Sequence, residues 1–71
     1  MASLRALTSK LQLALAMRGR RIGISTHRVW SDRAGRMVTK YMLREDGHTL
    51  LETWQLVDVV TYLAGQLDGG V

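Results

Sequence analysis

The stretch that decides the fold runs from Arg20 to Arg44 and reads R-R-I-G-I-S-T-H-R-V-W-S-D-R-A-G-R-M-V-T-K-Y-M-L-R. β-branched and aromatic residues recur along it, and such side chains suit a pleated, half-buried surface. Asp32 and Gly35 fit the first and fourth positions of a type I turn. The stretch therefore predicts one β-hairpin over about residues 20–44, closed by a turn at residues 32–35.

The predicted pairing of the two strands places Ser31 opposite Arg36. Successive side chains on a strand alternate between the two faces of the sheet. This register therefore separates an apolar face from a solvent-exposed, basic face. The predicted core face collects Ile22, Ile24, Thr26, Trp30, Met37, Tyr41 and Leu43, with Arg28 as its one misfit. The opposite face collects Gly23, Ser25, His27, Val29, Arg36, Val38, Lys40, Met42 and Arg44. The alternative is a three-residue loop with a bulge, which shifts the pairing by one and mixes the faces.

A helical pattern precedes the hairpin. Apolar residues follow helical spacing over about residues 3–18, which predicts an amphipathic helix. Ser3 is suited to be its N-cap, and Gly19 is a suitable stop.

A second helical pattern follows the hairpin. Thr49 and Glu52 match a capping box in front of an apolar run, which predicts a helix over about residues 50–67. The β-branched residues between 57 and 61 suit a strand as well. The absence of turn residues from 48 to 64 favours the helix.

The chain is short for an independent fold. Its 71 residues make one small domain, residues 1–71, with no cysteine for a disulfide. The predicted fold class is α+β, in the order α-β-β-α. A two-stranded sheet alone is barely stable, and a helix that is apolar nearly all round needs cover on more than one side. We therefore predict a homodimer, joined either through hairpin edges or through a helix interface at Trp54, Leu56, Val60, Leu63 and Leu67.

The charge is unevenly distributed along the chain. Residues 1–44 hold all ten Lys and Arg and one acid, whereas residues 45–71 hold five acids and no base. Such asymmetry indicates a polyanionic partner for the basic part. We predict a nucleic-acid contact, to DNA or RNA, through Arg20, Arg21, Arg33, Arg36, Lys40 and Arg44. The alternatives are that the two halves neutralise each other, or that the basic face is only solvated.

Signals for catalysis are weak. The chain has no cysteine nucleophile and no serine in a G-x-S-x-G context. Glu45, Asp46 and His48 fall in one turn, where three polar residues are usually solvated rather than metal ligands. We predict a non-enzymatic binding module with no cofactor and no metal. Trp30 could stack on an unpaired base, but its register favours the core.

Two alternatives concern partners and location. The apolar second helix could serve a small adaptor, inhibitor or regulator as a protein-interaction surface, with aromatic anchors. No apolar run approaches the ~20 residues of a membrane span, and we expect a cytoplasmic protein. Residues 1–31 contain no acid, and this composition is also typical of a mitochondrial targeting segment.

Overall fold

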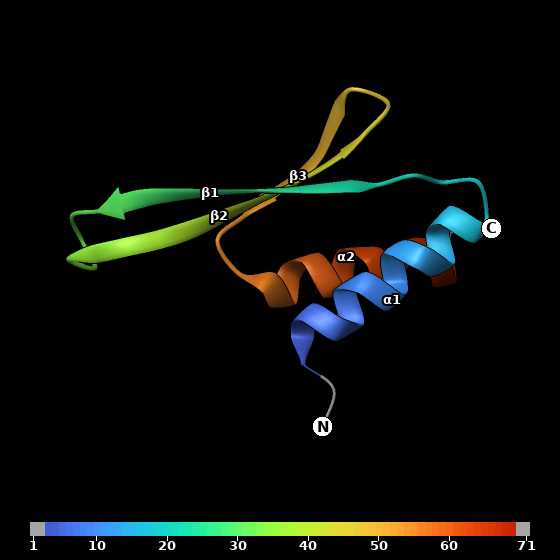
Figure 1. Ribbon diagram of the computed structural model, residues 1–71, viewed down its shortest axis with the longest axis horizontal. Helices are drawn as coiled ribbons and strands as arrows, with labels where there is room; N and C mark the ends of the chain where they lie inside the picture. Colours follow the sequence, from blue (N-terminus) through green and yellow to red (C-terminus); the bar gives the residue numbers. More distant parts are fainter. Residues whose placement is uncertain (1–2, 70–71) are drawn as a thin grey trace.

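The computed structural model describes residues 3–69, which form two helices and a three-stranded antiparallel sheet (Figure 1). The elements are α1 (Leu4–Met17), β1 (Gly23–Ser31), β2 (Arg36–Glu45), β3 (His48–Thr53) and α2 (Leu56–Gly69), and the sheet order is β1-β2-β3. The two helices lie side by side on one face of the sheet, and no other element of residues 3–69 covers the opposite face (Figure 1). The fold belongs to the α+β class, but its order is α-β-β-β-α rather than the expected α-β-β-α.

The β1–β2 hairpin has the register that the sequence predicts. Ser31 opposes Arg36, and the same pairing continues through nine residues to Gly23 opposite Arg44. The four-residue turn is closed by the backbone N–H of Gly35, which donates to the carbonyl of Ser31 at 2.8 Å. Gly35 has a φ of 65°, a conformation that glycine adopts without steric cost. The alternative register with a bulge at this turn is therefore wrong.

Helix α1 begins and ends within one residue of the predicted bounds. The Ser3 hydroxyl oxygen accepts from the Ala6 amide at 3.1 Å, as expected of an N-cap. Arg18 is the C-cap of the helix, and Gly19 follows it with a φ of 83°. The left-handed glycine ends the helix and turns the chain toward β1.

The predicted start of the second helix is wrong, because Thr49 and Glu52 lie in β3 and form no capping box. Asp46 and Gly47 have φ values of 52° and 80°, so they form the two-residue turn that joins tightly paired strands. The chain therefore returns along β2 at once, with Leu51 opposite Leu43. The helix begins only at Leu56.

The buried core lies where the two helices meet the base of the sheet. Its members are Leu15, Ile22, Leu43, Val59 and Leu63, each no more than 5% exposed. Ile24 and Tyr41 pack against it from the predicted core face of the hairpin.

The distal half of the hairpin reaches beyond both helices (Figure 1). We call residues 28–39 the arm. Trp30 and Met37, which were expected in the core, are 61% and 43% exposed, and Thr26 just before the arm is exposed as well. The alternation of faces was predicted correctly, but the 14-residue helices are too short to cover the whole hairpin.

Candidate nucleic-acid interface

The face of the sheet that the helices leave open carries three of the predicted contact cations: Arg36, Lys40 and Arg44. Leu43 and Tyr41 face the core, so the residues that alternate with them on β2 face the other way. We call this surface the helix-free face; it comprises Ser25, His27, Val29, Arg36, Val38, Lys40, Met42, Arg44 and Glu52. Three cations therefore lie in a row along β2, with about 14 Å from one to the next.

Arg36 and Arg44 lie at the two ends of this row. Both are exposed, and neither forms an ion pair with any residue that the structure describes. The Arg44 guanidinium donates to the carbonyl of Gly47 at 3.2 Å, which holds it near the β2–β3 turn. The remaining N–H groups of both guanidinium groups can donate to phosphate oxygens, which they fit in bidentate geometry.

Lys40 occupies the middle of the row and has two neighbours. Its Nζ lies 3.7 Å from a Glu52 carboxylate oxygen and 5.7 Å from the centre of the Trp54 ring. Ammonium groups at this distance are attracted to the face of an indole. Trp54 is 56% exposed, so an aromatic surface lies beside the central cation.

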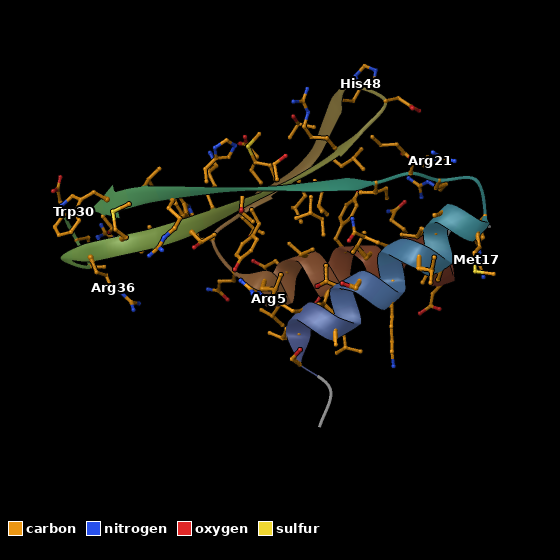
Figure 2. The ribbon with its side chains drawn as sticks, in the orientation of Figure 1. Arg5, Met17, Arg21, Trp30, Arg36 and His48 are labelled. Carbon is orange, nitrogen blue, oxygen red and sulfur yellow. The ribbon has the colours of Figure 1, made fainter. Side chains whose placement is uncertain are left out.

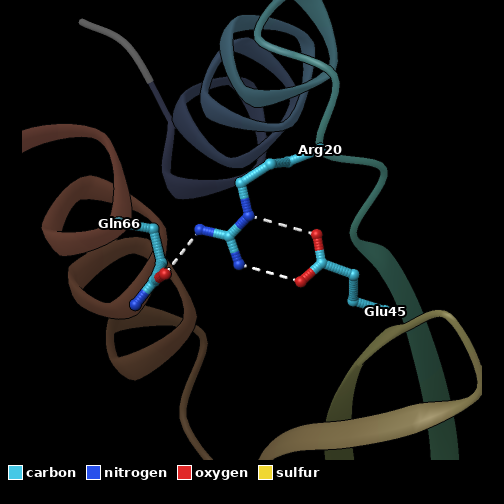
Figure 3. Close-up of polar contacts among 3 residues, drawn as sticks. All are labelled: Arg20, Glu45 and Gln66. Atoms are coloured by element: carbon cyan, nitrogen blue, oxygen red, sulfur yellow. Dashed lines mark hydrogen bonds and ion pairs between the residues drawn. The ribbon is translucent and has the colours of Figure 1, made fainter. Parts of the chain in front are cut away.

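Arg20, one of the six predicted contacts, has a structural role instead. Its Nη2 and Nε donate to the two Glu45 carboxylate oxygens at 2.8 and 3.1 Å, and its Nη1 donates to Gln66 Oε1 at 2.6 Å (Figure 3). The hydrogen bond with Glu45 raises the pKa of Arg20, and the same hydrogen bond lowers the pKa of Glu45. The guanidinium thus joins the segment after α1 to the end of β2 and to α2.

The Arg20–Glu45 pair predicts a pH dependence of stability. Because the pKa of Glu45 is lowered in the folded chain, the pair stabilises the fold above the ordinary glutamate pKa of about 4.3 and loses this effect as the pH falls through the lowered value. Glu45→Gln should therefore lower the urea midpoint at pH 7, and the two midpoints should converge in acid. Glu52→Gln is the control, because its carboxylate is 48% exposed and 3.7 Å from its partner. Equal midpoints for Glu45→Gln and wild type at pH 7 would contradict the assignment.

The remaining predicted cations lie at opposite ends of the sheet. Arg33 is exposed in the turn beside Arg36, whereas Arg21 is exposed before β1, at the base of the hairpin. Figure 2 shows Arg21 and Arg36 far apart along the hairpin. The structure therefore places Arg33 and Arg36 at the tip of the hairpin, Lys40 in the middle of β2 and Arg44 at its base. Arg21 is far from Arg36 but lies near Arg44, because Gly23, two residues after Arg21, is the strand partner of Arg44.

The residues predicted for a helix interface are largely used within the chain. Leu63 is fully buried, Leu56, Val60 and Leu67 are half-buried, and only Trp54 is exposed. Trp54 lies outside α2 and beside Lys40. Its place beside Lys40, at the border of the helix-free face, was missed because β3 was taken for helix. The signal was the period of two between Glu52, which lies in β3, and Trp54, which follows the end of this strand.

Other kinds of site find little support in the described part of the chain. Across residues 3–69, no group of three or more His, Asp or Glu side chains is placed to hold a metal ion. No helix within the same range is long and apolar enough to cross a membrane.

Comparison with protein families, curated proteins and solved structures finds no match to this chain.

Proposed function

We propose that this protein is a non-enzymatic module that binds nucleic acid across the helix-free face of its sheet. The observation that carries the proposal is the row of Arg36, Lys40 and Arg44 on a face that both helices leave open. Each phosphate that such a side chain neutralises releases counterions, and this release drives association. Arg33 at the turn extends the row beyond Arg36.

Lys40 can take part although it has an acidic neighbour. The Lys40–Glu52 pair is long, at 3.7 Å, and both side chains are partly exposed. Exposed pairs of this kind contribute little free energy, so a phosphate can replace Glu52 as the partner of the ammonium. Arg36 and Arg44 have no such competitor among the described residues.

Trp54 gives the face an aromatic surface next to the central cation. Proteins that bind single strands combine a basic track with aromatic side chains on which bases stack. A single strand can bring its phosphates to the row on β2 and an unstacked base to the exposed indole. The arrangement therefore favours single-stranded nucleic acid over a duplex, whose bases are stacked already.

The test of this part is a pair of substitutions at Trp54. Stacking of one base is worth about 1–3 kcal/mol, so Trp54→Ala should weaken binding of a labelled single-stranded oligonucleotide about 5- to 150-fold. Trp54→Phe keeps an aromatic ring and should retain most of the affinity. Fluorescence anisotropy measures both. If the alanine variant binds as tightly as wild type, no base stacks on Trp54.

A protein-interaction module remains the second candidate function, and α2 is less suited to it than expected. Val59 and Leu63 of this helix are fully buried against the rest of the chain. Val57, at 46% exposed, is its one large hydrophobic residue on the surface. The exposed apolar side chains that could anchor a partner lie mostly on α1 and on the arm: Leu4, Leu7, Leu13 and Met17 on α1, and Val29, Trp30 and Met37 on the arm.

A further inference from the structure

β1 is an edge strand with unusual length and little charge. It runs for nine residues, Gly23–Ser31, and Arg28 is its only Lys, Arg, Asp or Glu. The carbonyl of Ser31 is used inside the hairpin, and backbone groups of alternate residues point to the same side of an antiparallel strand. Residues 24, 26, 28 and 30 therefore direct their N–H and C=O groups to the free edge, where another strand can pair with them.

Two apolar features flank this edge on the helix side of the sheet. Trp30, at 61% exposed, projects from the arm, where neither helix of its own chain lies beneath it (Figure 2). At the other end of β1, a groove runs between α1 and the start of the strand. Its lining is Gln12, Leu13, Ala16, Arg21, Ile22 and Gly23, and Leu13 is 64% exposed.

We propose that β1 pairs antiparallel with β1 of a second copy of this chain, about a two-fold axis that passes through His27. Only this centre pairs all nine residues, because His27 is the middle residue of Gly23–Ser31. The pairing sets Ile24 opposite Trp30 of the second copy and Thr26 opposite Arg28, so no like charges of Arg, Lys, Asp or Glu face each other. It joins the two sheets into one of six strands.

The same register brings the two apolar features together. Trp30 of one copy lies opposite Ile24 of the other, on the helix side, and therefore reaches the groove between α1 and Ile22. The overhanging arm of each copy then lies beside the helix-covered half of its partner. The indole leaves solvent and covers Leu13 and Ala16, which a single chain leaves exposed.

The area is sufficient for a stable dimer. The two paired edges, each about 30 Å long and about 10 Å deep, bury roughly 600 Å². Trp30 is 61% exposed in the single chain, so two indoles, with the two groove surfaces that they cover, bury roughly 500 Å² more. Together these contacts bury roughly 1,100 Å², above the roughly 1,000 Å² that a specific interface needs. Small folds without disulfides often gain stability from such association.

A single cysteine at the proposed axis tests the register. The two His27 Cα atoms would form a non-hydrogen-bonded pair about 4.5 Å apart, within the roughly 4.4–6.8 Å that a disulfide spans. His27→Cys should therefore cross-link to a dimer on mild oxidation. Ser25→Cys is the matched control, because its two copies would lie about 14 Å apart. The chain has no other cysteine, so any disulfide joins two copies. Equal cross-linking of both variants, or of neither, would overturn the register.

A pair of arginine substitutions on α1 tests the groove. Leu13→Arg puts a charge into the groove and should turn the dimer into a monomer, as measured by sedimentation velocity. Met17→Arg adds the same charge to the same helix at a residue that is 81% exposed and outside the groove lining, and it should stay dimeric. A monomeric wild type, or a dimer that survives Leu13→Arg, would overturn the proposal.

The proposed dimer and the proposed nucleic-acid interface are independent of each other, and separate experiments test them. Pairing through β1 leaves the helix-free face open in both copies, because all four helices lie on the other side of the joined sheet. Strand pairing and apolar burial depend little on salt, so the sedimentation coefficient should be the same at about 50 and about 200 mM salt, where phosphate binding changes steeply. A salt-sensitive dimer would indicate an interface built on charges instead.

Discussion

Replacing Leu43 by alanine is expected to cost about 2–5 kcal/mol of the free energy of unfolding, as large-to-small changes in a packed core do. Leu43 is fully buried in the middle strand, where it is opposite Ile24 on β1 and Leu51 on β3. A domain of 71 residues has a total stability of about 4–11 kcal/mol. The substitution should therefore remove a large share of the stability, or all of it.

Urea unfolding followed by far-ultraviolet circular dichroism at fixed protein concentration measures this loss. Met17→Ala is the control, because Met17 is 81% exposed and surface substitutions usually change stability by about 0.5 kcal/mol or less. An unfolding midpoint of Leu43→Ala equal to that of the control would contradict the position of the core.

Removing Arg36 and Arg44 together is expected to weaken binding of a duplex by roughly 200-fold at 50 mM salt, when the two affinities are taken as equal at 1 M salt. These are the cations of the helix-free face that have no acidic partner among the described residues. In the counterion-release relation, two lost duplex phosphate contacts lower the slope of log affinity against log salt by about 1.8. The variant Arg36→Ala/Arg44→Ala should thus lose both affinity and salt sensitivity.

The matched control is Arg5→Ala/Lys10→Ala. It removes the same number of positive charges from α1, where both side chains are exposed, and so it separates a local contact from an effect of net charge. Anisotropy titrations at several salt concentrations give affinity and slope for each variant, and circular dichroism reports whether each is folded. Equal losses in the two double variants would show that net charge alone attracts the nucleic acid.

The β1–β2 hairpin could be predicted from the sequence because three local signals agree. Turn residues at Asp32 and Gly35, a run of β-branched side chains and a clean separation of faces all lead to the register with Ser31 opposite Arg36. The N-cap at Ser3 is a signal of the same local kind. Such features depend on neighbouring residues only, so the sequence carries them directly.

The third strand could not be told from helix because its sequence suits both. Thr49 and Glu52 have the spacing of a capping box, and Leu50 and Leu51 fit an apolar helix face as well as a strand. The deciding feature is the Asp46-Gly47 turn, whose positive φ values return the chain to β2. Pairing with β2 supplies hydrogen bonds on both sides of a β-bulge at Leu50, and this tertiary gain outweighs the local helix signal.

The candidate site was predicted in part. The alternation of Arg36, Lys40 and Arg44 on the solvent-exposed face followed from strand periodicity, which the structure shares. The role of Arg20 did not follow, because its partners Glu45 and Gln66 are 25 and 46 residues away in the sequence. The exposure of Trp30 depends on where the helices end relative to the hairpin, which is a property of the whole fold.

The most direct test of the nucleic-acid interface is the affinity of the wild-type protein for labelled single-stranded and duplex oligonucleotides at 50 and 200 mM salt. Two to three phosphate contacts per chain predict that duplex affinity falls about 10- to 40-fold between these concentrations. Stacking on Trp54 predicts tighter binding of the single strand at both. Absence of binding at 50 mM salt, or an affinity that does not change with salt, would contradict a nucleic-acid interface on the helix-free face.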